Sequence, residues 1–143
     1  MKNIIKLSAS FLFFSLLWFG CKKSTPGIRD LSGTYAISIN ETKKIPSGAN
    51  FATLTLVDIV DTRCPPNANC VNSGSVKVTV KFKDGLINQT IDLCLGTCTK
   101  ELKTIKSRGI NYIISLSEVL PEPTMYFYLS SLPPTAKIEL TRM

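Results

Sequence analysis

Four cysteines in two closely spaced pairs are the residues of this chain best suited to chemistry. Five residues separate Cys64 from Cys70, and three separate Cys94 from Cys98. Paired thiols form disulfides, bind soft metal ions or cycle as redox couples, but zinc ribbons and thioredoxin-like sites usually space them as Cys-x-x-Cys, which neither pair does. We therefore predict two structural disulfides, with no metal site and no cofactor. A metal-binding or thiol-redox protein is the alternative interpretation.

The short spacings favour pairing within each segment, as Cys64–Cys70 and Cys94–Cys98. Prolines and asparagines, which favour turns, occupy most of positions 65–69. The second segment would span about 13 Å if extended, whereas a disulfide needs its Cα atoms within about 7 Å. Gly96 permits the turn that this requires. A crossed pairing between the two segments stays open at this stage.

Other catalytic chemistry is poorly represented in the chain. It contains no histidine, which excludes Ser-His-Asp and Cys-His catalysis and every histidine-containing metal site. Asp58 and Asp61 are the closest early pair of carboxylates, but their opposite strand parity would direct them to opposite faces of a sheet. We expect Asp61 to cap the following turn or to pair with Arg63. The protein is therefore predicted not to be an enzyme.

The N-terminus has the organisation of an export signal. Lys2 and Lys6 give it positive charge, and an apolar stretch over 7–19 follows. This stretch is shorter than the roughly 20 residues of a membrane span and fits the apolar region of a signal peptide. The residues Leu-Leu-Trp-Phe-Gly before Cys21 resemble the bacterial lipobox, although Trp stands where Leu is usual. We predict a helical signal peptide over 1–20, lipidation of Cys21 and a membrane as partner through that lipid. Plain secretion and an uncleaved anchor are the alternatives.

The mature chain then divides into a tether over 21–32 and a folded domain over 33–143. Removing Lys2 and Lys6 lowers the formal charge from +7 to +5. The remaining positive charges are spread along the chain, whereas nucleic-acid binding needs a clustered basic face. We therefore predict no nucleic-acid partner. Lys22-Lys23, beside the lipid, favours anionic head groups.

Alternating apolar and polar residues dominate the domain. The clearest case is Ser75–Lys83, in which Val76, Val78, Val80 and Phe82 occupy one face and lysines stud the other. Asp84-Gly85 then predicts a two-residue hairpin turn. Residues 99–107 are ambiguous, since Leu102 and Ile105 could share one helical turn. Further strands are predicted over Thr34–Ile39, Ala52–Val60, Leu86–Leu93, Ile110–Ser117, Met125–Ser130 and Ala136–Arg142.

About seven short antiparallel strands separated by turn signals predict an all-β fold. We expect a single β-sandwich, or a partly open barrel, which the two disulfides supplement. The lysines at positions 77, 81 and 83 would then form a solvated sheet face. Binding of an anionic partner to this row is the alternative.

One segment resembles a known group of proteins. Asp61-Thr62-Arg63-Cys64-Pro65, followed by Cys70-Val71-Asn72-Ser73-Gly74, is similar to a motif of small lipoproteins common in the Bacteroidota. Asn72 departs from their usual tryptophan. The resemblance implies a β-sandwich-like domain but no activity, because the group is largely uncharacterised. Surface-exported members often carry acidic residues where this chain has Lys22-Lys23, so we expect attachment to the outer membrane with the domain facing the periplasm.

The loop between the first two cysteines is the predicted binding element. It is polar and rich in turn formers, as recognition loops often are. We predict a non-enzymatic binding or structural module of the cell envelope, with an unidentified protein or glycan as ligand. A hydrolase inhibitor that inserts this loop into an active site is a further alternative. The candidate binding residues are Arg63, Pro65, Pro66, Asn67 and Asn69.

Overall fold

The computed structural model describes residues 30–46, 52–85, 87–98, 102–124 and 132–143. The predicted signal peptide, Cys21 and the predicted strand Met125–Ser130 lie outside these ranges. No helix long and apolar enough to cross a membrane occurs among the described residues.

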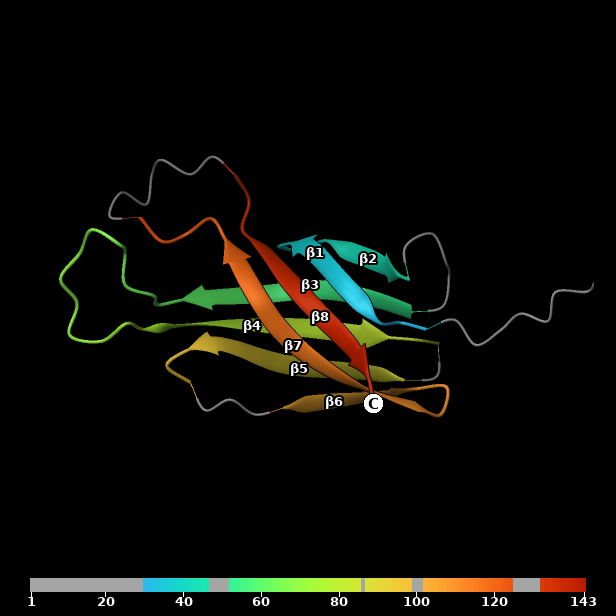
Figure 1. Ribbon diagram of the computed structural model, residues 1–143. Helices are drawn as coiled ribbons and strands as arrows, with labels where there is room; N and C mark the ends of the chain where they lie inside the picture. The colour runs from blue at the N-terminus through green and yellow to red at the C-terminus, as the bar shows by residue number, and fades with distance from the viewer. Residues whose placement is uncertain (1–29, 47–51, 86, 99–101, 125–131) are drawn as a thin grey trace, which may run out of the picture.

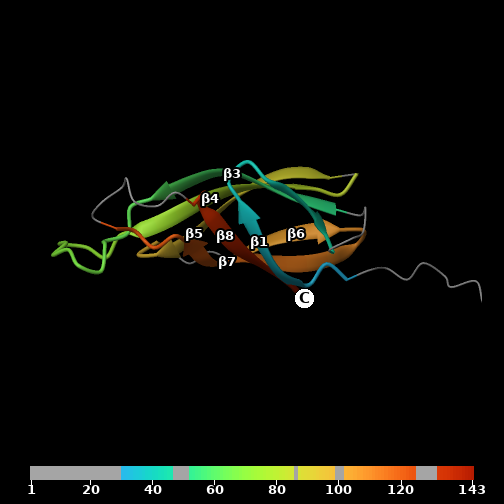
Figure 2. The same cartoon turned by 90° about the horizontal axis from the view of Figure 1, so that it is seen from above.

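Eight antiparallel strands form two four-stranded sheets that pack face to face (Figures 1 and 2). The first sheet has the order β1-β8-β7-β6, and the second has the order β2-β3-β4-β5. The all-β sandwich predicted from the sequence is thereby confirmed. The strands of the first sheet are β1 (Gly33–Ser38), β6 (Lys103–Ser107), β7 (Ile110–Leu120) and β8 (Thr135–Arg142); those of the second are β2 (Thr42–Ile45), β3 (Ala52–Asp61), β4 (Ser75–Lys83) and β5 (Asn88–Gly96).

Strict alternation builds the core between the sheets. In β4 the apolar residues at positions 76, 78, 80 and 82 are at most 1% exposed, while the lysines at 77, 81 and 83 are exposed. Burying a side chain of this size contributes about 1.5–3 kcal/mol. From the other sheet, Ile114, Ile138 and Leu140 are equally buried. The sandwich is therefore held chiefly by this single apolar layer.

Two β-bulges interrupt the alternation where it would otherwise turn apolar residues outward. The register of β3 against β4 shifts between Leu56 and Asp58, and that of β7 against β8 shifts between Leu116 and Glu118. A bulge places two residues opposite one. Leu56 and Ile59 therefore both pack against the core although they are three positions apart.

Two strands differ from the sequence-based expectation. The ambiguous region 99–107 contains strand β6, not a helical turn, because Ile105 enters the core while Leu102 is 65% exposed. Strand β2 was not predicted. It has four residues, two of them lysines, and it is held by pairing with β3.

The β4–β5 hairpin is present, but its connection is longer than the two residues predicted. Lys83 pairs with Asn88, so four residues connect the strands. Asp84 is only 4% exposed, and its Oδ2 accepts a 2.8 Å hydrogen bond from the Ser107 hydroxyl of the other sheet. Its Oδ1 accepts from the Ile87 amide at 3.0 Å. This carboxylate therefore turns inward and joins the two sheets.

The chain enters the sandwich at one end, which we call the entry end. Leu31 is buried, and its carbonyl accepts a 2.9 Å hydrogen bond from the Tyr35 hydroxyl. The Arg142 amide donates to the Ser32 hydroxyl at 3.1 Å. The domain thus takes in part of the segment assigned to the tether. Residues 62–74 project from the opposite end, the loop end (Figures 1 and 2).

Candidate functional site

The candidate site is the loop of residues 62–74, which leaves β3 and returns into β4. Its base continues the pairing of these strands, because the Thr62 amide donates to the Ser75 carbonyl at 2.8 Å and the Cys64 amide donates to the Ser73 carbonyl at 2.9 Å. Nearer the tip, the Ala68 amide donates to the Pro65 carbonyl at 3.0 Å. The loop is therefore an ordered extension of the hairpin.

Two disulfides cross-link the chain at the loop end of the molecule. Cys64 is bonded to Cys70 and Cys94 to Cys98, with Cα–Cα distances of 6.0 and 6.3 Å. The predicted local pairing is confirmed, and the crossed pairing is not formed. Each closed loop is short, so each disulfide contributes about 2 kcal/mol in the chain-entropy account.

The two stapled segments nevertheless lie side by side. The carbonyl of Gly74 accepts hydrogen bonds from the Thr97 amide at 3.1 Å and from the Thr97 hydroxyl at 2.9 Å. A Cβ atom at Gly96 would lie 2.7 Å from the same carbonyl oxygen. The second cysteine turn thus supports the base of the first loop.

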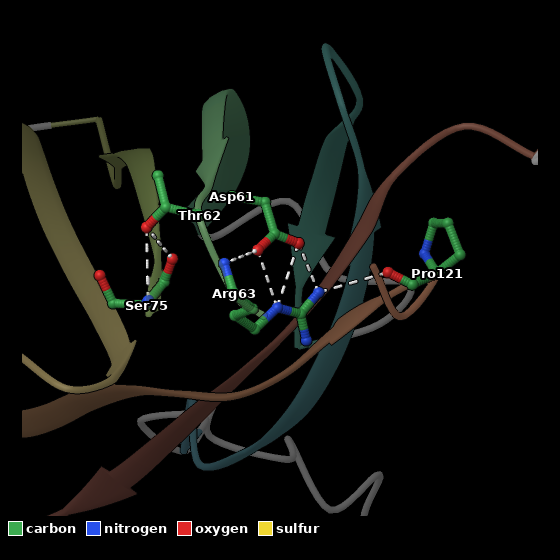
Figure 3. Close-up of polar contacts among 5 residues, drawn as sticks. All are labelled: Asp61, Thr62, Arg63, Ser75 and Pro121. Atoms are coloured by element: carbon green, nitrogen blue, oxygen red, sulfur yellow. Dashed lines mark hydrogen bonds and ion pairs between the residues drawn. The ribbon is translucent and has the colours of Figure 1, made fainter. Parts of the chain in front are cut away.

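Gly74 closes the base of the loop against Thr62. Its φ is +71°, and a Cβ atom there would lie 1.9 Å from the backbone oxygen of Thr62. The Thr62 hydroxyl donates to the Ser75 carbonyl at 2.8 Å and accepts from the Ser75 amide at 3.3 Å (Figure 3). The two backbone segments at the base of the loop therefore approach more closely here than any side chain at position 74 would allow.

Asp61 and Arg63 form the second fastening of the base. The Arg63 Nε lies 2.9 and 3.1 Å from the two carboxylate oxygens of Asp61, and the Arg63 amide donates to Oδ1 at 3.0 Å (Figure 3). The guanidinium also donates to the Pro121 carbonyl at 3.3 Å, which ties the loop to the segment after β7. The predicted pairing of Asp61 with Arg63 is confirmed. These contacts hold Arg63 at the base of the loop, and its place among the candidate binding residues stays a prediction.

These contacts predict a dependence of loop stability on pH. Partial burial opposes ionisation of Asp61, but the side-chain and backbone hydrogen bonds from Arg63 outweigh it and hold the pKa of the carboxyl below its usual range. When the pKa of a carboxyl is lower in the folded protein than in the unfolded chain, its ionisation stabilises the folded state. This stabilisation is complete above the pKa of the unfolded chain and is lost as pH falls through the pKa of the folded protein. We expect wild type to exceed Asp61→Asn in stability at neutral pH. Urea unfolding should show this difference shrinking below about pH 4, and a difference that is unchanged down to pH 2 would contradict the assignment.

The returning arm of the loop, directly after Cys70, exposes an apolar side chain that is not among the predicted binding residues. Val71 is 99% exposed, more than any other large hydrophobic residue of the described chain. Of the predicted binding residues, Pro66, Asn67 and Asn69 are exposed beside it, and Pro65 is half-buried. The only signal for Val71 in the sequence was an aliphatic residue within a polar turn.

A groove of about 860 Å³ opens beside the site, where β5 faces β7. Its walls carry Asp92 and Glu139, which come from different sheets. Asp92 Oδ1 accepts a 2.8 Å hydrogen bond from the Thr79 hydroxyl. Among the described residues, no group of three or more His, Cys, Asp or Glu side chains is placed to hold a metal ion.

Comparison with known proteins gives no assignment. Neither the models of known protein families, nor the curated proteins, nor the solved structures contain a match to this chain.

Proposed function

We propose that this protein is a lipid-anchored lipoprotein of the outer membrane that faces the periplasm and binds a protein partner through its 62–74 loop. The observation that carries the proposal is Val71, an aliphatic side chain that is 99% exposed in the disulfide-bonded loop, directly after Cys70. A central apolar anchor ringed by polar groups is the usual organisation of a binding hot spot. Asn67, Asn69 and Asn72 are exposed in the same loop and offer polar amides for the surround of such an anchor.

Rigidity of the loop supports binding more than catalysis. A loop that is already ordered loses little conformational freedom when a partner docks, so more of the contact energy appears as affinity. The tip itself offers proline, amide and aliphatic groups, none of which is a general acid or base at neutral pH. Asp61 and Arg63, the charged groups at the base, are engaged with each other.

The position of the loop supports presentation away from a membrane. The chain enters the sandwich at the end opposite the loop (Figure 1). If Cys21 carries the lipid, Val71 lies on the far side of the domain from the bilayer, where a partner can reach it. The apolar stretch before Cys21 and the lipobox-like ending support this anchoring.

The intact mass of the natively exported protein, measured before and after reduction, tests the proposed lipid anchoring and the two disulfides. We expect a chain that lacks residues 1–20, carries acyl groups on Cys21 and gains the mass of four hydrogen atoms on reduction. Metal analysis of the same sample should find no stoichiometric ion. An unmodified Cys21 would contradict the anchoring, and thiols that react without a reductant, or a bound metal, would favour the metal or redox alternative.

A further inference from the structure

The outer face of the second sheet carries a group of three lysines that we call the lysine patch: Lys44, Lys81 and Lys83. All three side chains are exposed. Lys44 and Lys83 lie in one cross-strand row on either side of Thr53, and Lys81 lies in the next row. Strand geometry places Lys81 and Lys83 about 7 Å apart and Lys44 about 10 Å from Lys83. Short polar residues fill the rest of the two rows: Thr42, Thr53, Thr55, Asn88 and Thr90.

The positive charge of the lysine patch is not balanced on its own face. Within the described part of the chain, none of its ammonium groups forms an ion pair or a hydrogen bond. The carboxylates of this face, Asp58 and Asp92, lie together on a row nearer the loop end, on either side of Thr79. Three unpaired cations at this spacing repel one another, so an anionic surface against them would be favourable.

Protection of sheet edges accounts for Lys44, which lies on the edge strand β2, but not for Lys81 and Lys83. Exposed lysines commonly prevent edge strands from pairing with other chains. Lys81 and Lys83, however, belong to β4, which is paired on both sides, with β3 and with β5. The outer edge strand β5 has Asn88, Thr90 and Asp92 on this face instead.

Charge is also divided along the length of the domain. At the entry end, Lys106, Arg108 and Arg142 carry further positive charge on the first sheet and its β6–β7 turn, while Asp84 is buried against Ser107. Asp58, Asp61, Asp92, Glu118 and Glu122 lie toward the loop end, where Asp61 and Glu118 are ion-paired with Arg63 and Lys137. At the entry end, the exposed carboxylate of Asp30 lies against Ser32 and near Arg142. An anionic surface would therefore attract the entry end and repel the loop end.

We infer that the lysine patch docks the entry end of the domain on an anionic lipid surface. The inference rests on the proposed membrane anchoring, because the chain that joins the domain to Cys21 enters at this same end. Nine peptide steps separate Cys21 from Asp30, and at about 3.4 Å each they reach about 30 Å, which lets the patch touch the bilayer. Lys22-Lys23 adds charge of the same sign beside the lipid. Docking in this orientation points the 62–74 loop away from the membrane.

Lysine acetylation rates, read by mass spectrometry on the full exported protein, test this inference. The protein is bound to vesicles of phosphatidylcholine alone or of equal parts phosphatidylcholine and phosphatidylglycerol. On the anionic vesicles at about 0.1 M salt, acetylation of the three patch lysines should fall about fivefold. The protection should disappear at about 1 M salt, where the Debye length is about 3 Å. Lys77 is a matched internal control, because it lies on the same face of the same strand in the acidic half and should react equally on both vesicles.

A double variant checks that the patch causes the docking. Lys44→Gln/Lys81→Gln should abolish the protection of Lys83, whereas Lys77→Gln should leave it intact. Equal protection on neutral and anionic vesicles, or none on either, would overturn the inference. Protection by soluble dextran sulfate but not by vesicles would also overturn it, in favour of an anionic glycan. Flotation on neutral vesicles reads the anchor separately, so loss of anchoring and loss of docking are distinguishable.

Discussion

Gly74→Ala is expected to lower the free energy of unfolding by about 4 kcal/mol. An L-residue at the φ of +71° found here costs about 1–2 kcal/mol. The added Cβ would also lie 1.9 Å from the Thr62 backbone oxygen and 2.9 Å from the Arg63 Cα, and neither atom belongs to a flexible side chain. Relief of this overlap must separate the two strands at the base of the loop and break the hydrogen bonds between Thr62 and Ser75.

Gly109→Ala is the matched control for this variant. Gly109 has a similar φ of +85°, but a Cβ atom there would meet nothing within 4 Å. Gly109→Ala should therefore lower the free energy of unfolding only by the cost of the left-handed backbone conformation, about 1–2 kcal/mol. Urea unfolding with the disulfides intact measures both variants. Equal losses of stability would show that the close approach at position 74 does not hold the loop.

Removal of the Cys64–Cys70 disulfide is expected to weaken binding. Cys64→Ala/Cys70→Ala should cost about 2 kcal/mol of stability, and it releases residues 64–70, which Val71 directly follows, from one ordered conformation. Reordering even one or two residues on binding costs about 1–2 kcal/mol each, so affinity for the partner should fall by about tenfold or more.

Cys94→Ala/Cys98→Ala separates this effect from loss of stability. Its expected stability cost is similar, about 2 kcal/mol. The Thr97 hydrogen bonds to Gly74 still support the base of the loop, and the tip keeps its own staple. Partner binding should therefore stay within about twofold of wild type. Equal losses of binding in the two double variants would contradict a specific role of the tip.

The fold was predictable where one local pattern determined the structure. Ser75–Lys83 matches β4 at both ends, because its alternation is uninterrupted. Strands β2 and β6 were missed because they are short and rich in lysine, and their pairing partners hold them in place. The bulges in β3 and β7 were not visible either, since only the register against a neighbouring strand defines them.

The sequence indicated the position and local disulfide of the candidate loop, but not its full set of contacts. The spacing of the cysteines and the turn formers between them identified the loop and its local disulfide. The local pairing of Arg63 with Asp61 could be anticipated from their spacing, but its contact with the distant Pro121 could not. The exposure of Val71 and the close approach at Gly74 depend on how the loop folds back, which no local pattern encodes.

Photo-crosslinking from position 72 in producing cells tests the central claim most directly, that the 62–74 loop is the partner-binding element. Asn72 is exposed and adjacent to Val71, so a photoreactive residue there samples the partner without replacing the anchor. A probe at Asn111, exposed on β7, serves as control. We predict one discrete crosslinked protein from position 72, lost with Val71→Asp and with Cys64→Ala/Cys70→Ala but retained with Cys94→Ala/Cys98→Ala. The same product from position 111, or a product that persists with Val71→Asp, would contradict the claim.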